Sequence, residues 1–138
     1  MEDRIRLTPI GRVVSSLKKL EDCPKQGREG APPARIEIFP QFRPAMADIG
    51  VGHELIILTW FHRGHRNTLK VHPRGNPGNP LTGVFSTRSP DRPNPIGHHL
   101  VQVVAVDGTD LVVTPMEALD ETPVIDIKIG LKDGPLNT

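Results

Sequence analysis

Three closely spaced prolines in the segment Gly83–Leu100 (GVFSTRSPDRPNPIGHHL) constrain the fold more than any other feature of the chain. Pro90, Pro93 and Pro95 each fix their own φ angle, lack a backbone donor and push the preceding residue into an extended conformation. The residues Ser89–Pro93 therefore have few conformations available to them. We expect a stiff, irregular loop here, with the regular structure arranged around it.

Strand-forming residues flank this loop on both sides. Val84, Phe85 and Thr87 favour extended structure, and Gly83 before them is typical of a turn, so the loop is expected to follow a strand. A second predicted strand, His98–Val106, begins soon after the last proline. A stiff polar loop between two strands is more typical of a binding site than of a simple connection.

The loop carries Arg88, Asp91, Arg92 and Asn94, of which the two arginines and the asparagine could donate hydrogen bonds to a ligand. Planar guanidinium groups match carboxylates, phosphates and base faces, and the carboxamide suits an amide or a base edge. Because a stiff loop holds these groups in place, less entropy is lost when a ligand binds. These three residues are the candidates for catalysis. A proline-stiffened turn with solvated arginines remains the alternative.

The composition favours short strands joined by turns. The 138 residues predict a single domain, 1–138, and 15 prolines with 13 glycines suit turns better than long helices. With four Phe, one Trp and no Tyr, the core must consist of Val, Ile and Leu. There is no GxGxxG fingerprint, and RGNPGNP lacks the lysine and helix of a phosphate-binding P-loop. We therefore predict an all-β, non-Rossmann fold with long loops.

Alternating and β-rich segments locate the strands. Ala34–Phe39 alternates, with Ile36 and Ile38 on one face, and the apolar run His53–His62 predicts the central strand. The pair Asp107-Gly108 is a strong hairpin signal. The remaining expected elements are strands at Ile5–Ser15, Thr68–His72, Leu111–Pro115 and Val124–Ile129, a long loop at Leu17–Pro33 and one helical turn at Pro44–Ile49.

The last predicted strand has two distinct faces. Alternation assigns to them the sets Val124, Asp126, Lys128 and Ile125, Ile127, Ile129. Asp126 and Lys128 then form either an exposed ion pair of little energetic value or part of a pocket floor. Both interpretations remain open.

Charge is unevenly distributed along a chain whose net charge is only +1. Residues 61–100 contain six Lys or Arg, one acid (Asp91) and five of the six histidines, whereas residues 101–138 contain two Lys and seven acids. The basic segment favours a polyanionic partner such as RNA.

Cys23 and the terminal sequence bear on the cellular compartment. A single cysteine allows no internal disulfide, which suits a reducing cytoplasm. The N-terminus MEDRIRLTPIG has no apolar region, and no run approaches membrane-spanning length. We expect a cytoplasmic protein without membrane contact. Cys23 has no flanking His and is not expected to be a nucleophile.

The histidines of the run HRGH are candidate metal ligands. His62 and His65, with His72, His98 or His99 as a third ligand, would suit zinc. However, Gly64 and the loop context disrupt helical spacing, and no cysteine pair supports such a site. We expect no metal.

The motif GVFSTRSPDRPNPIG, with TPVIDIK downstream, resembles the TsaA-like (TrmO) family, and the resemblance extends from Pro9 to Lys128. It implies a β-barrel-like domain, a homodimer, S-adenosylmethionine as cofactor and tRNA as partner. The implied reaction is methyl transfer to N6 of an adenosine that lies next to the anticodon and bears a threonylcarbamoyl group. Arg88 or Arg92 would bind the carboxylate of that group, and the donor would lie at or near the subunit interface.

The resemblance also implies a set of cofactor-binding residues. They are Pro24, Lys25, Gln26, His62, Arg63, Arg88, Leu100, Asp120, Glu121, Thr122 and Pro123. Two of these depart from the family pattern, because Lys25 replaces an arginine and Glu121 replaces a glycine. Without the resemblance, Asp120–Pro123 is an ordinary acidic turn. A non-catalytic module that binds S-adenosylmethionine or RNA is the competing function.

Overall fold

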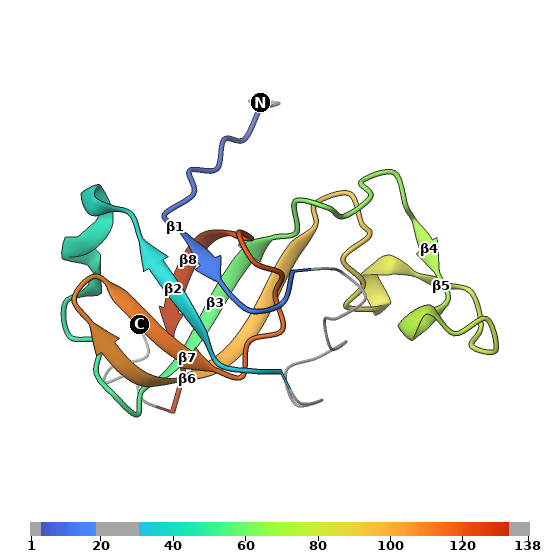
Figure 1. The fold of residues 1–138 in the computed structure, drawn as a ribbon. Helices are drawn as coiled ribbons and strands as arrows, with labels where there is room; N and C mark the ends of the chain where they lie inside the picture. Colours follow the sequence, from blue (N-terminus) through green and yellow to red (C-terminus); the bar gives the residue numbers. More distant parts are fainter. Residues whose placement is uncertain (1–3, 19–30, 133–138) are drawn as a thin grey trace.

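A closed six-stranded β-barrel forms the body of the molecule in this computed structural model, which describes residues 4–18 and 31–132 (Figure 1). Around the barrel the strands are β1 (Gly11–Val14), β2 (Ala34–Ile38), β7 (Asp110–Thr114), β6 (Ile96–Asp107), β3 (Glu54–Trp60) and β8 (Pro123–Ile129). All neighbouring pairs are antiparallel. The predicted all-β, non-Rossmann and barrel-like fold is thereby confirmed.

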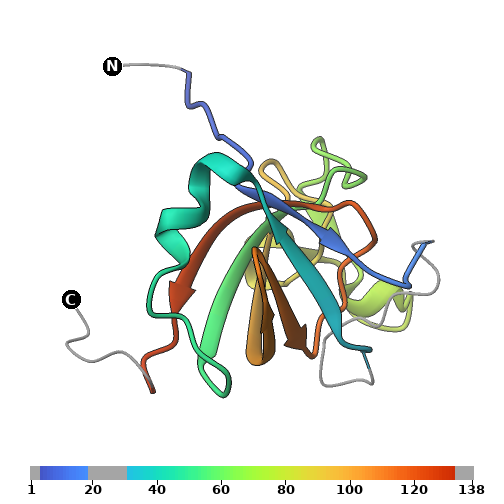
Figure 2. The ribbon, with the colours of Figure 1, turned by 60° about the vertical axis from the view of Figure 1, so that its left-hand side comes forward.

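The barrel interior is filled by aliphatic side chains from every strand, and Figure 2 shows the strands arranged around it. In β2 and β3, alternate residues are buried, as the period of a strand requires. Ile36, Leu55, Ile57, Leu111 and Val113 are among the fully buried residues. Burial of each such side chain contributes roughly 1.5–3 kcal/mol. The expectation of a core built on Val, Ile and Leu is correct.

A bulge in β8 overturns the face assignment expected for that strand. The register between β3 and β8 shifts after Leu58, so that Leu58 pairs with Asp126 but Thr59 pairs with Val124. The extra residue, Ile125, moves Val124 to the same side as Ile127, and both contact the core. Strict alternation was therefore the wrong rule at this position. The Asp126–Lys128 pair lies outside, with its charged atoms 3.9 Å apart and both side chains more than half exposed.

The predicted hairpin is confirmed by β6 and β7, which pair on either side of the Asp107-Gly108 turn. Gly108 has a φ of 61°, a conformation that costs glycine little. The expected strand at Ile5–Ser15 is restricted to β1, because Pro9 cannot donate to a strand ladder. The expected helical turn is a 3-10 helix, η3 (Pro40–Met46), that starts earlier than predicted.

A smaller lobe, built by residues 61–95, extends from one end of the barrel (Figure 1). It contains the two-stranded sheet β4 (Lys70–Val71) and β5 (Thr82–Gly83) and the 3-10 turns η4 (Pro73–Gly75) and η5 (Val84–Ser86). The strand expected from Val84 to Thr87 is wrong, because the Val84 carbonyl accepts from both the backbone N–H and the hydroxyl of Thr87. This turn directs the chain into the proline loop.

Candidate functional site

Arg92 holds the proline loop together from within. Its guanidinium donates to three backbone carbonyls, those of Val84 (2.9 Å), Thr87 (3.0 Å) and Ser89 (3.1 Å). Carbonyls in an irregular loop lack the hydrogen-bond donors that a sheet would supply. The planar guanidinium of Arg92 donates to several of them at once. The structure thus commits Arg92 to the shape of the loop, whereas the sequence suggested a group presented to a ligand.

The loop is also clamped by the segment that follows β3. The backbone N–H of His65 donates to the Asp91 carboxylate (2.9 Å), and Arg66 donates to the Pro93 carbonyl (2.8 Å) and to the Asn94 side-chain oxygen (3.2 Å). Gly64 lies so close that a Cβ atom there would sit 2.5 Å from the Pro90 carbonyl oxygen. The two loops therefore form one rigid unit.

Arg66 and Trp60 were missed by sequence reasoning. The guanidinium of Arg66 lies 5.1 Å from the centre of the Trp60 ring, a cation–π contact that orients it towards the loop. The available signal was a tryptophan at a strand end, followed six residues later by an arginine in a basic segment. That pattern is too common to single out.

Arg88 differs from Arg92, because its side chain is exposed and forms no hydrogen bond or ion pair with another described residue. It lines an open hollow of about 990 Å³ between the proline loop and the β4–η4 segment. Phe85, His72, Arg74 and Asp91 line the same hollow. The free fork of Arg88 is therefore available to an anionic or planar ligand.

The turn Asp120–Pro123 lies at the barrel end from which the small lobe extends, and its polar groups are engaged in the fold. The Asp120 carboxylate accepts from the Ser15 N–H and from the Lys18 ammonium, both at 2.8 Å. Burial acts to raise the pKa of Asp120, but the two hydrogen bonds, together with the positive charges of Lys18 and Arg12, outweigh it and hold the pKa below its usual value. Thr122 is buried and donates to the Leu119 carbonyl.

Glu121, one of the two departures from the family pattern, has a backbone conformation that favours glycine. Its φ is 68°, in the left-handed region that glycine adopts without cost. The glycine expected from the resemblance would adopt this backbone conformation without strain. In this chain a glutamate adopts it, and the glutamate side chain is exposed. The Glu121 carboxylate lies 3.5 Å from the Arg12 guanidinium.

The remaining predicted residues are spread over different places. His62 and Arg63 are exposed and directly follow β3, at the same barrel end as Asp120. Leu100 lies in the middle of β6, on the outer face of the barrel, and is 54% exposed. Pro24, Lys25 and Gln26, like Cys23 and most of the predicted loop Leu17–Pro33, lie outside the described residues. Of the predicted cofactor residues that the structure describes, only Arg88 lines the hollow.

A buried polar cluster lies under this end of the barrel. The Thr59 hydroxyl is 2.7 Å from Nε2 of His99, and Nδ1 of His99 is 2.6 Å from a Glu117 oxygen. The Phe61 ring packs edge-on against the His99 ring. Sequence reasoning treated His99 only as a possible metal ligand, because the contact depends on strand register and on a distant segment.

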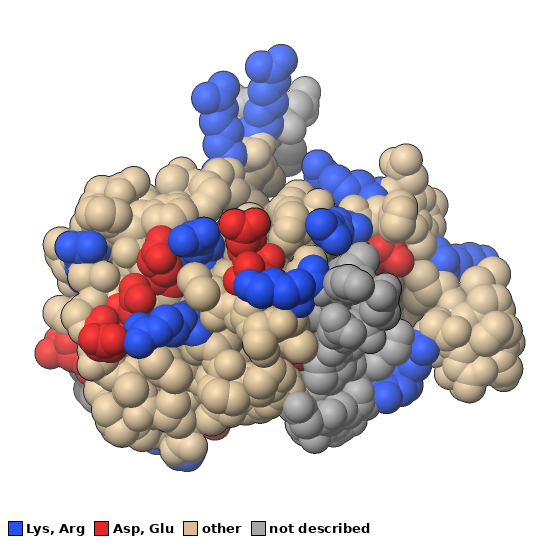
Figure 3. All heavy atoms as spheres, viewed as in Figure 1, with Lys and Arg blue, Asp and Glu red and all other residues tan. Residues whose placement is uncertain are grey.

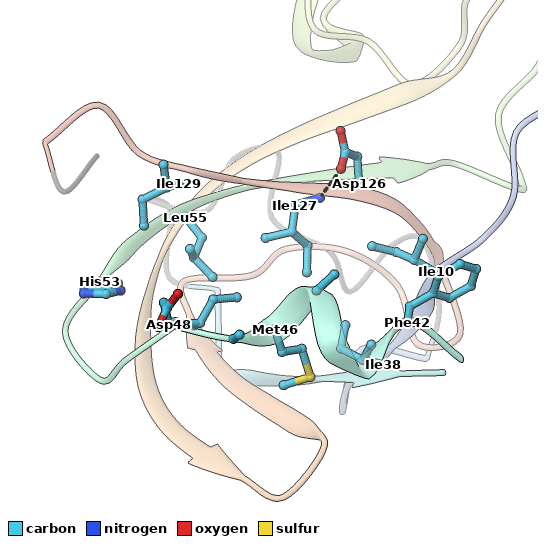
Figure 4. A pocket seen from close by; sticks show the side chains of 13 residues that line it. Ile10, Ile38, Phe42, Met46, Asp48, His53, Leu55, Asp126, Ile127 and Ile129 are labelled. Atoms are coloured by element: carbon cyan, nitrogen blue, oxygen red, sulfur yellow. Dashed lines mark hydrogen bonds between the residues drawn. The ribbon is translucent and has the colours of Figure 1, made fainter. Parts of the chain in front are cut away.

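The opposite end of the barrel carries a separate, largely apolar cavity of about 550 Å³. Side chains of Phe42 and Met46 from η3 point into it together with Leu55 and Ile127 (Figure 4). Asp126 points away from the cavity, and its carboxylate accepts from the Ile127 N–H at 2.9 Å. The described members of the predicted site are not among the residues that line this cavity.

Charged side chains on the barrel form ion pairs, in which Arg12 pairs with Glu37 and Arg35 pairs with Asp107 and Asp110. On the face shown in Figure 3, acidic and basic groups alternate over the barrel. Among residues 4–18 and 31–132, no group of three or more His, Cys, Asp or Glu side chains is arranged to hold a metal ion. Nor does the described part of the chain contain a helix with the length and apolar character needed to cross a bilayer.

Comparisons with known proteins agree on one family. Residues 12–132 match the family model of the tRNA-methyltransferase O N-terminal domain. The chain is 43% identical to a probable S-adenosyl-L-methionine-binding protein of Methanothermobacter thermautotrophicus, over 94% of this chain and 92% of the relative. It is 41% identical to an S-adenosyl-L-methionine-binding protein of Archaeoglobus fulgidus, over 88% and 86% of the two chains.

A crystal structure of TrmO from P. aeruginosa has the same fold. It superposes with a TM-score of 0.75 at 25% sequence identity, and the match covers 100% of this chain but 61% of the TrmO chain. This chain therefore spans less than two thirds of that solved protein. Together, the matched domain, the relatives and the shared barrel establish that the chain belongs to the TrmO (tRNA-methyltransferase O) family, through its N-terminal domain.

Proposed function

We propose that this protein is an S-adenosylmethionine-dependent methyltransferase that modifies N6 of an adenosine next to the tRNA anticodon, where the adenosine bears a threonylcarbamoyl group. Family membership supports the class of reaction. The observation that carries the proposal is Arg88, whose free guanidinium projects from a braced loop into an open hollow. A carboxylate such as that of the threonylcarbamoyl group is a ligand that this fork can bind through two parallel hydrogen bonds.

The residues at this end of the barrel fit a nucleoside cofactor. His62, Arg63 and Arg88 are exposed there, and the Asp120–Pro123 turn is adjacent. S-adenosylmethionine would supply an electrophilic methyl group on a positively charged sulfur. His62, Arg63 and the backbone of the turn would hold the cofactor, and Asp120 would act by fixing the turn, since its carboxylate is already bonded to Lys18 and Ser15.

The reaction itself requires little from the protein beyond alignment. S-adenosylmethionine would supply its methyl group to the N6 nitrogen of adenosine and leave as S-adenosylhomocysteine, and N6 would lose its proton to solvent. Alignment of the two reactants can supply several orders of magnitude in rate. A loop fixed by Arg92, Arg66 and three prolines suits this role, with Arg88 and Asn94 orienting the substrate.

We further propose that the active form is a homodimer. The outer face of β6 presents Ile96, Leu100 and Val104, each between 42% and 54% exposed. Leu100 pairs in register with Ile56 of β3, so the apolar surface continues onto the neighbouring strand. A second copy packed on this face would bring Leu100 to the donor site of its partner, which accounts for its distance from the other predicted residues.

The proposal is tested by measuring S-adenosylmethionine binding by calorimetry and methyl transfer to tRNA with and without the threonylcarbamoyl group. We expect transfer to the modified tRNA only. Arg88→Ala should reduce kcat/KM at least about 100-fold, whereas Arg88→Lys, which keeps the charge but not the fork, should retain part of the activity. Full activity of Arg88→Ala would show that Arg88 does not take part in substrate binding or catalysis.

A non-catalytic S-adenosylmethionine-binding protein is the second candidate. The names of the relatives from M. thermautotrophicus and A. fulgidus favour it, because both describe binding alone. Cofactor binding without methyl transfer to any tRNA preparation would support this candidate.

A further inference from the structure

Phe85 is the most exposed aromatic side chain among the described residues, with 84% of its surface accessible. Its position follows from the η5 turn, in which Val84 is buried at 2% exposure and the next side chain is directed outwards. Exposing a large aromatic ring forgoes the favourable free energy of burying it. The stiff framework around η5, with Arg92 and Thr87 both bonded to the Val84 carbonyl, keeps the ring in this position.

The surroundings of Phe85 are polar and cationic. The ring borders the open hollow that Arg88 also lines, together with His72, Arg74 and Ser86. Among the described residues, Asp91 is the only acid that lines the hollow, and it already accepts hydrogen bonds from His65. A protein partner would favour an apolar surface around the ring, whereas a ring beside guanidinium groups in an open groove is typical of single-stranded nucleic-acid binding.

From this arrangement we propose that Phe85 is a stacking platform for an unpaired nucleobase of the RNA substrate. The flat ring is accessible because it projects from the rim of the hollow, and the neighbouring cations attract the phosphates of the same strand. The inference rests on the proposed function for the choice of RNA. It adds a residue that binds a base next to the reacting one and takes no part in cofactor binding.

The test measures RNA affinity without any reaction. A fluorescein-labelled anticodon stem-loop RNA is titrated with the full chain, and the anisotropy is followed for wild type, Phe85→Ala, Phe85→Trp and Leu81→Ala. Leu81 is the control, because it is 57% exposed in the same lobe and does not line the hollow. We expect Phe85→Ala to raise Kd by roughly 5- to 100-fold, and Phe85→Trp and Leu81→Ala to bind as wild type does.

Two further measurements separate stacking from other roles. Calorimetry should give the same S-adenosylmethionine affinity for Phe85→Ala as for wild type, and a fully paired RNA duplex should compete poorly for the labelled stem-loop. Unchanged RNA affinity of Phe85→Ala would overturn the proposal, as would a parallel loss of dimer in sedimentation velocity. Phe85-dependent RNA binding without methyl transfer would instead contradict only the proposed enzyme activity.

Discussion

Arg88 and Arg92 are four positions apart in one loop, yet their guanidinium groups have different surroundings. Arg92 donates to three carbonyls of its own loop, while Arg88 lines an open hollow and bonds to no other described residue. A guanidinium that satisfies backbone carbonyls stabilises the fold, and one that keeps its donors free is available to a ligand. The two residues therefore have separable roles.

Replacement of Arg92 should reduce stability and activity together. Arg92→Ala leaves three carbonyls with one partner fewer, so we expect a loss of about 1–3 kcal/mol in the free energy of unfolding. The measurement is urea denaturation followed by circular dichroism, with Arg88→Ala as the matched control of unchanged stability. Equal stability of the two variants would contradict the roles assigned to them.

Asp120 should make stability depend on pH in the acid range. Its pKa is lower in the folded protein than the ordinary value of 3.8, so the folded state binds this proton less readily than the unfolded state does. The ionised Asp120 therefore stabilises the fold fully at a pH above its ordinary pKa. This stabilisation is lost as the pH falls through the lowered pKa of the folded state. Asp120→Asn should be less stable than wild type at neutral pH, and the difference should narrow in acid.

Lys18 provides the matched test of this acid dependence. Its hydrogen bond to Asp120 lowers the pKa of that carboxyl, so Lys18→Ala should shift the loss of stability to a higher pH than in wild type. Urea unfolding measured over a pH series would show this shift. If the free energy of unfolding depends on pH in the same way for both proteins, the Lys18–Asp120 ion pair contributes nothing to the acid dependence of stability.

At the scale of the secondary-structure elements, the buried cluster of Thr59, His99 and Glu117 is the junction of the site. Thr59 lies near the end of β3, just before His62, while His99 lies in β6, just after the proline loop. Glu117 belongs to the segment that leads into the Asp120 turn. Each member therefore anchors one of the described site segments, and their hydrogen bonds fix the positions of the three segments relative to one another.

Thr59→Val should loosen this junction. Nε2 of His99 lies within hydrogen-bond distance of the Thr59 hydroxyl, and Nδ1 lies within hydrogen-bond distance of Glu117. Valine keeps the shape but leaves Nε2 buried without a partner, at a cost of about 1–3 kcal/mol. We expect a lower urea midpoint and weaker S-adenosylmethionine binding, with the exposed Thr8→Val as control. A midpoint equal to that of Thr8→Val would show that the hydroxyl is dispensable.

For the molecule as a whole, the barrel separates two environments. One end carries η3 and an apolar cavity, and the other carries the braced loops, the exposed Arg88 and the basic lobe. The outer face of β6 lies between these ends and exposes Leu100. In the proposed dimer, Leu100 on this face reaches the donor site of the partner copy at the lobe-bearing end of that barrel.

Leu100→Glu should abolish dimer formation, because a charge would have to be buried against an apolar surface. Sedimentation velocity should then give a monomer, and methyl transfer should be lost with it if the partner completes the site. Ile5→Glu is the control, since Ile5 is 87% exposed and precedes β1, which lies on the opposite side of the barrel from β6. A wild-type monomer, or a dimer that tolerates glutamate at position 100, would exclude this interface.

The sequence alone determined the strand content, the hairpin at Asp107-Gly108 and the stiffness of the proline loop, because these depend on local preferences and on spacing along the chain. Only the tertiary structure decided the inward face of β8, where a bulge against β3 shifts the alternation. It also separated Arg88 from Arg92 and joined Thr59, His99 and Glu117, since hydrogen-bond partners far apart in sequence depend on how the barrel closes.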